Sequence, residues 1–149
     1  MNEFEIVTVI QRPVDEVFAF VEKAENTPLY SPSVSEAHQT AEAPIGVGST
    51  AVLVGKFLGR RFETTWEVFD YKLNERFASK TVSGPFDLEI TNTFEPEGAG
   101  TKITGLYRGE SRGFFKLAEP VIFRITKKQF EASAETMREL LEAEDQPGS

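Results

Sequence analysis

Asn92 and Tyr107 are the polar residues of this sequence best suited to chemistry inside an apolar setting. Each can both donate and accept a hydrogen bond, so each could hold or polarise a hydroxyl or carbonyl group. Because a buried polar group without a partner costs about 1–3 kcal/mol, such residues indicate internal hydrogen bonds or a cavity whose contents they contact. Both belong to a set of polar residues that share the inward-facing alternation of their strands: Thr8, Thr64, Ser79, Thr81, Asn92 and Tyr107.

The usual catalytic side chains are scarce at inward-facing positions. The single histidine, His38, alternates with Glu36 and is expected to face solvent. This removes the residue most often used for acid–base chemistry near neutral pH. Arg60, Arg61 and Arg112 stand near turns and could reach a cavity mouth, where an arginine would meet a carboxylate or enolate. A surface position is the simpler interpretation of all three arginines.

The sequence predicts neither a metal site nor a cofactor site. It contains no cysteine and one histidine, so thiolate sites and histidine clusters are excluded. Residues 46–48 have the pattern Gly-x-Gly, but the third glycine and the following helix of a dinucleotide-binding loop are missing.

Aromatic residues are abundant, with thirteen phenylalanines, three tyrosines and one tryptophan. Those of inward parity could line a ligand cavity or fill a close-packed core. The predicted ligand-binding set joins them with aliphatic and polar neighbours: Phe62, Thr64, Trp66, Leu88, Ile90, Asn92, Phe94, Tyr107, Phe123 and Phe130.

The elements that position these residues are mainly strands. Residues 3–11 alternate, and six further strands are expected between Val34 and Gly109, where turn signals recur at spacings too short for helical crossovers. The sheet should therefore be antiparallel. Residues 60–71 and 86–94 alternate most cleanly, which indicates one buried and one solvated face. Gly105 and Gly109 flank Tyr107 and predict sheet curvature or room for another group.

Helices are expected after the first strand and at the end of the chain. Pro13, Asp15 and Glu16 favour a helix start, and a second short helical turn is expected near Thr27 and Pro28. A preliminary turn at 113–119 and a long amphipathic helix at 120–143 complete the prediction. The apolar stripe of this helix must pack on the inner face of the sheet.

Length and charge narrow the classes of partner. The 149 residues fit one domain, expected over 1–143, with a disordered tail at 144–149. A net charge of −8 with scattered basic residues argues against a nucleic-acid partner. The sequence shows neither a signal peptide nor a membrane-spanning stretch, so we expect a cytoplasmic protein without stable membrane insertion. The pattern does not predict an oligomeric state.

Several segments, in order, resemble one superfamily. They are residues 12–21, with a Pro-x-x-x-Val-Phe helix start, residues 25–32, with Asn-x-Pro-x-aromatic, the turn at 44–49, Gly84-Pro85-Phe86, residues 100–104 and the terminal helix. The chain resembles the START-like (SRPBCC) superfamily, and within it the polyketide cyclase/dehydrase-like branch. This resemblance spans nearly the whole chain. It implies an α+β helix-grip fold, in which a curved seven-stranded antiparallel sheet wraps around a long C-terminal helix, with two short helices after the first strand.

The resemblance does not fix an activity, because one fold hosts many functions. It implies that such proteins include lipid carriers, hormone sensors and ring-closing enzymes. Our first hypothesis is binding of a hydrophobic small molecule, such as a lipid, fatty acid, isoprenoid or polyketide. The second is a cyclase or dehydratase that relies on positioning and on polarising a carbonyl. The third is a protein-interaction module, which a solidly filled interior would favour.

Overall fold

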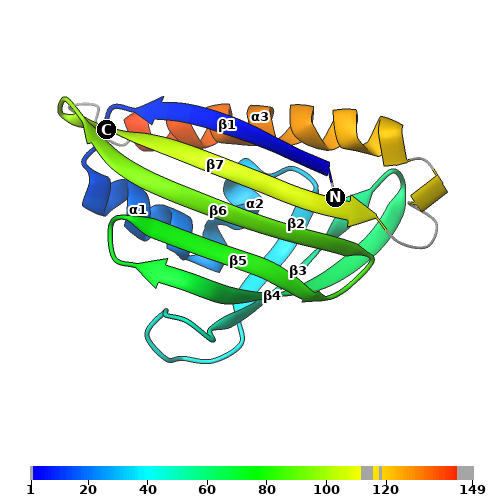
Figure 1. The fold of residues 1–149 in the computed structure, drawn as a ribbon. Helices are drawn as coiled ribbons and strands as arrows, with labels where there is room; N and C mark the ends of the chain where they lie inside the picture. The colour runs from blue at the N-terminus through cyan, green and yellow to red at the C-terminus, as the bar shows by residue number, and fades with distance from the viewer. Residues whose placement is uncertain (1, 112–115, 118, 144–149) are drawn as a thin grey trace.

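The computed structural model describes residues 2–111, 116–117 and 119–143, and Figure 1 shows their arrangement. Seven strands form one antiparallel sheet in the spatial order β1-β7-β6-β5-β4-β3-β2. The strands are β1 (Asn2–Ile10), β2 (Val34–Gln39), β3 (Thr50–Phe57), β4 (Arg60–Lys72), β5 (Arg76–Ser83), β6 (Phe86–Glu97) and β7 (Gly100–Ser111). From β2 to β7 each strand pairs with the next one along the chain. The first strand, β1, pairs with the last, β7, and forms the other edge of the sheet.

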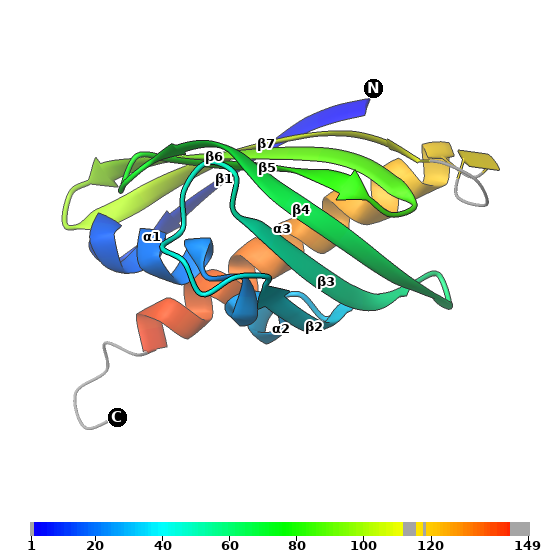
Figure 2. The same cartoon turned by 90° about the horizontal axis from the view of Figure 1, so that it is seen from below.

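The sheet is strongly curved around a long helix, α3 (Glu119–Ala143), as the view from below shows (Figure 2). Register shifts interrupt the β4–β5 pairing at Thr65/Trp66 and Val68/Asp70, and a further shift lies between β2 and β3. Such irregularities bend a strand and increase its twist. The bent sheet therefore presents one concave face, and the inward residues of all strands converge on α3.

Three short helical segments follow β1: α1 (Val14–Glu22), η1 (Ala24–Asn26) and α2 (Thr27–Tyr30). Pro13 stands at the N-cap of α1, and its carbonyl accepts hydrogen bonds from the backbone N–H groups of Glu16 and Val17. Pro28 occupies the first turn of α2, where a missing N–H costs nothing. α2 contacts both β2 and α3, so it connects the far edge of the sheet to the helix.

Two apolar cores lie at opposite ends of α3. The larger core is at the C-terminal end of α3, under α1, and its buried members are Ile10, Val17, Phe18, Phe94, Ile103 and Leu141. The smaller core is at the N-terminal end, where Phe57 and Ile122 are buried and Phe62, Phe86 and Ile125 pack against them. Between these ends the helix and the sheet do not fill the space completely.

The predicted helix-grip architecture is confirmed, including seven antiparallel strands, the C-terminal helix and short helices after β1. The main helix begins one residue earlier than predicted, at Glu119, and η1 was not anticipated. The predicted tail at 144–149 and most of the predicted turn at 113–119 lie outside the described residues. Within the described ranges, no helix has the length and apolarity to cross a bilayer.

Candidate ligand cavity

A cavity of about 320 Å³ lies between the concave face of the sheet and α3. Its volume is at the lower end of the range that small-molecule sites occupy. The wall is built from alternate residues of neighbouring strands, since their inward side chains form one continuous surface. The pairs Phe4/Tyr107, Ile90/Tyr107 and Ser79/Ile90 are cross-strand neighbours in register.

Stacked aromatic rings form the part of the wall where β1 and β7 meet α3. The Tyr107 ring stacks on Phe4, with centroids 5.0 Å apart and planes 8° from parallel. Its centroid is 4.5 Å from that of Phe130 on α3. Phe123 meets the edge of Phe4, at 5.6 Å between centroids. Pairs of this kind add stabilisation beyond the buried area, so Tyr107 is held in one orientation.

Gly105 gives the Tyr107 and Asn92 side chains the room they need. A Cβ atom at Gly105 would lie 2.8 Å from Tyr107 Cε1 and 2.9 Å from Asn92 Oδ1. It would also lie 3.3 Å from the Tyr107 hydroxyl oxygen. The amide and the hydroxyl therefore converge above one glycine. Gly109 likewise makes room for the Leu88 side chain, so neighbouring side chains account for both glycines.

The Asn92 amide and the Tyr107 hydroxyl line the cavity, and among the described residues neither has a hydrogen-bond partner. Burial raises the pKa of the Tyr107 phenol above its ordinary value, and an electrostatic interaction with Tyr30 raises it further. Burial also raises the pKa of Tyr30, and a hydrogen bond with the Thr27 side chain lowers it by a smaller amount. Both phenols are therefore neutral at physiological pH and available as hydrogen-bond donors.

Two other predicted polar residues have their partners within the protein. The Trp66 indole Nε1 donates to Thr64 Oγ1 at 2.9 Å, and Thr64 is only 2% exposed. The Thr81 hydroxyl donates to the Phe86 carbonyl and accepts from the Leu88 N–H. Thr81 therefore holds the β5–β6 pairing together and is absent from the cavity wall.

Nine of the ten predicted ligand-binding residues lie on the cavity wall: Phe62, Thr64, Trp66, Leu88, Ile90, Asn92, Tyr107, Phe123 and Phe130. Their contact with a ligand stays a prediction. Phe94 has the expected inward direction but lies in the larger core, 3% exposed, with its ring centroid 5.0 Å from that of Phe18. It misses the wall because α1 covers this end of the sheet.

The remaining candidates lie away from the cavity or outside the described residues. His38 is exposed, as predicted. Arg60 and Arg61 are exposed and do not line the cavity. Arg112 lies outside the described residues.

The cavity wall also includes residues that the sequence analysis missed. α3 contributes Thr126, Gln129 and Ser133, which lie between the predicted apolar positions and the charged face. α2 contributes Thr27 and Tyr30. Phe4 could have been selected, because it shares the inward face of β1. The α2 residues could not, because sequence alone does not show that this short helix reaches α3.

Charged groups border the cavity, and most of them have partners. Glu22 accepts a hydrogen bond from the Tyr71 hydroxyl at 2.7 Å. Glu119 pairs with Lys116 at 2.8 Å. Arg108 is directed to the outer face, where Nε lies 3.1 Å from Glu3. The interior of the wall is thus apolar with neutral polar groups.

A sequence model described as "polyketide cyclase / dehydrase and lipid transport" matches residues 1–142. The chain belongs to this family. The match covers nearly every residue of the fold, so the curved sheet, α3 and the cavity between them all fall within the family's sequence pattern. A search of curated proteins gave no match.

Several solved structures share the fold of this chain at low sequence identity. The Thermus thermophilus protein TTHA0849 has a TM-score of 0.82 at 19% identity, covering 97% of this chain and all of its own. A START superfamily protein from Mycobacterium smegmatis has a TM-score of 0.79 at 16% identity, covering 95% and 97%. The Zhui aromatase/cyclase from Streptomyces sp. R1128 has a TM-score of 0.77 at 12% identity, covering 99% and 98%.

Proposed function

We propose that the protein binds a small, predominantly apolar molecule in the cavity between the sheet and α3. The observation that carries this proposal is the cavity itself, about 320 Å³ in volume and walled by aromatic and aliphatic side chains. A ligand that covers this apolar wall would remove it from water, which is favourable by about 25 cal/mol for each Å² of apolar surface buried.

The family supports a ligand that is lipid-like, isoprenoid-like or polyketide-like, because its description names lipid transport and polyketide chemistry. The rigid aromatic surface formed by Phe4, Tyr107 and Phe130 would contact the apolar body of such a molecule. Asn92 and Tyr107 would then satisfy its polar group. A protein-interaction module is less well supported, because a filled interior would favour that hypothesis and the interior contains a cavity.

A second candidate function is ring closure or dehydration of a polyketide-like substrate. The convergence of Asn92 and Tyr107 near Gly105 favours it, because the Tyr107 hydroxyl could donate to a substrate carbonyl oxygen while Asn92 Oδ1 accepts from a neighbouring substrate hydroxyl. The family description and the aromatase/cyclase structure point the same way. If turnover of a polyketide-like substrate were found and survived the double change Asn92→Leu and Tyr107→Phe, this assignment would be wrong.

The binding proposal is tested by native mass spectrometry of the purified protein, with its organic extract analysed alongside. We expect a retained apolar species that disappears in Ser79→Phe, since Ser79 lines the cavity and a ring there would occupy it. Lys80→Phe is the matched control, because Lys80 is the next residue on the same strand and its ammonium lies over Phe69, away from the cavity. Equal retention by both variants would contradict binding in this cavity.

A further inference from the structure

The charges around the cavity restrict which ligands it can accept. Four charged residues contribute to the described part of its wall: Glu22, Arg108, Glu110 and Glu119. Three of these are carboxylates. Arg108, the one cation among the described wall residues, is about half exposed and has two acidic neighbours on the outer face, Glu3 at 3.1 Å and Glu89 at 3.9 Å.

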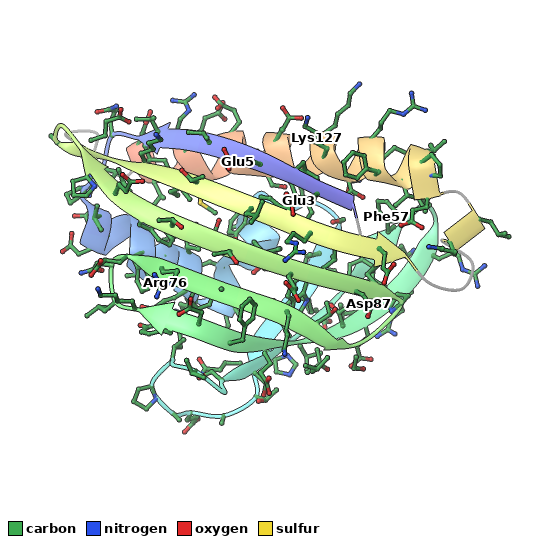
Figure 3. The ribbon with its side chains drawn as sticks, in the orientation of Figure 1. Glu3, Glu5, Phe57, Arg76, Asp87 and Lys127 are labelled. Atoms are coloured by element: carbon green, nitrogen blue, oxygen red, sulfur yellow. The ribbon has the colours of Figure 1, made fainter. Side chains whose placement is uncertain are left out.

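The arginine side chain therefore offers no counter-charge to a ligand inside the cavity. Arg108 lies on the outward parity of β7, between the inward-facing Tyr107 and Gly109. Among the other described basic residues, Lys116 is paired with the wall residue Glu119 at 2.8 Å, and Lys127 is exposed on α3 (Figure 3). A negative charge brought into the cavity would lose its hydration without gaining an ion pair from the described residues.

The hydration energy that a negative charge would lose is large compared with the hydrogen bonds that Asn92 and Tyr107 could make to it. Burying an ionised carboxylate without a paired cation is among the most costly steps in protein energetics. The net charge of −8 adds repulsion. A neutral hydroxyl or carbonyl group incurs neither penalty.

The polar groups deep in the wall suit such a neutral group. The Asn92 amide supplies two donors and one acceptor, and the Tyr107 hydroxyl supplies one donor and can also accept. Both face the cavity without a protein partner among the described residues. Asn92 Oδ1 and the Tyr107 hydroxyl oxygen lie 2.9 Å and 3.3 Å from the Cβ position of Gly105. A ligand hydroxyl beside them could donate to Asn92 Oδ1 and accept from the Tyr107 hydroxyl.

We propose that the cavity selects uncharged ligands, with Asn92 and Tyr107 binding a hydroxyl or carbonyl group, and that it discriminates against carboxylates of the same size and shape. This inference rests on the proposed binding function and specifies its ligand class. Free fatty acids would be poor ligands, whereas alcohols, phenols and ketones with the same apolar body would bind well.

The test compares three compounds that differ in one group: para-butylphenol, butylbenzene and para-butylbenzoate. Binding is measured by isothermal titration calorimetry near neutral pH. Trp66 emission reports occupancy, because the single tryptophan lines the cavity. We expect the phenol to bind at least about tenfold more tightly than the benzoate, which corresponds to about 1.4 kcal/mol. Butylbenzene is expected to fall between them.

Variants assign the effect to the two polar residues. Asn92→Leu and Tyr107→Phe are each expected to weaken phenol binding about fivefold to tenfold, while butylbenzene affinity changes less than about twofold. Retained butylbenzene binding shows that each variant is folded with an intact cavity. Thr136→Val is the control, because the Thr136 hydroxyl on α3 already donates to the Ala132 carbonyl and is not on the wall.

The outcomes separate this inference from the proposed function. If none of the three compounds binds or changes Trp66 emission, the proposed function fails. If the benzoate binds as tightly as the phenol, the cavity binds ligands but the selection against charge is wrong. If phenol and butylbenzene lose affinity equally in Asn92→Leu, the assignment of Asn92 to the polar group is wrong.

Discussion

At the scale of single residues, the cavity depends on Gly105 as much as on the residues that line it. The Tyr107 ring is fixed between Phe4 and Phe130, and it extends across the position where a side chain at 105 would stand. The ring cannot move aside without losing its stacking. The glycine therefore determines where the Tyr107 hydroxyl and the Asn92 amide meet.

Replacing Gly105 by alanine should destabilise the protein and impair the polar site. The added Cβ would overlap Tyr107 Cε1 and Asn92 Oδ1, and overpacking of this kind costs about 1–3 kcal/mol. Urea denaturation measures the change in the free energy of unfolding. Gly46→Ala is the control, because a Cβ at Gly46 meets no atom within 4 Å, and its effect should stay within about 0.5 kcal/mol. Equal effects would contradict the packing described for Gly105.

At the scale of elements, α3 combines two roles in one helix. Its C-terminal part packs in the larger core through Leu141, and its N-terminal part packs in the smaller core through Ile122. The cavity wall takes Phe130 and Ser133 from the middle of the helix, and Ile122 lines it as well. The buried ends therefore hold the helix in place, and Leu141 does so without lining the cavity.

This division predicts that Leu141→Ala lowers stability without changing the cavity. Leu141 is 3% exposed and does not line the cavity, so its truncation should cost about 2–5 kcal/mol. Leu140→Ala is the matched control, since Leu140 is the preceding residue and is 37% exposed; its cost should stay below about 1 kcal/mol. Thermal or urea denaturation gives both values. The idea fails if the two variants are equally stable.

At the scale of the whole molecule, all three tyrosines favour the folded state in their neutral form. Burial raises the pKa values of Tyr30 and Tyr107, and burial together with the hydrogen bond to Glu22 raises the pKa of Tyr71 to about 12. In the unfolded chain each phenol should titrate near its ordinary pKa of about 10. Their contribution to stability is therefore full below about pH 10 and is lost as the pH rises through 12 and beyond.

Stability should accordingly fall between about pH 9 and pH 12, with phenolate appearing together with unfolding. The measurement is a pH series of urea denaturation, accompanied by the ultraviolet absorbance of phenolate. Tyr71→Phe should make the fall shallower, since it removes one of the three phenols whose pKa is raised in the fold. Phenolate absorbance that develops with an ordinary pKa in the intact fold would contradict the burial of these side chains.

The sequence predicted the sheet well because alternation is a local signal. Phe62, Trp66, Leu88 and Ile90 reach the cavity through strand parity, which any antiparallel sheet with one buried face preserves. Phe94 also faces inward but belongs to the core. Alternation predicts which face of the sheet a side chain lies on, but not whether the cavity or the core lies opposite it. Whether a ring meets α1 or open space depends on tertiary packing.

Other parts of the site depended on contacts that the sequence does not encode locally. Tyr30 reaches the wall because α2 packs against α3, about one hundred residues later in the chain. Ser133 lies at a polar position of α3 that periodicity alone assigns to no particular neighbour. The role of Gly105 required knowledge of which side chains extend over it, although its inward position beside Tyr107 was visible beforehand.

The most direct test of the central claim is a crystal structure of the protein soaked with para-butylphenol. We expect the aromatic ring in the cavity against Phe130 and Trp66, with its oxygen within hydrogen-bond distance of Asn92 Oδ1 or the Tyr107 hydroxyl. An empty cavity at saturating ligand, or a filled interior in which the side chains of the wall close upon one another, would contradict the account.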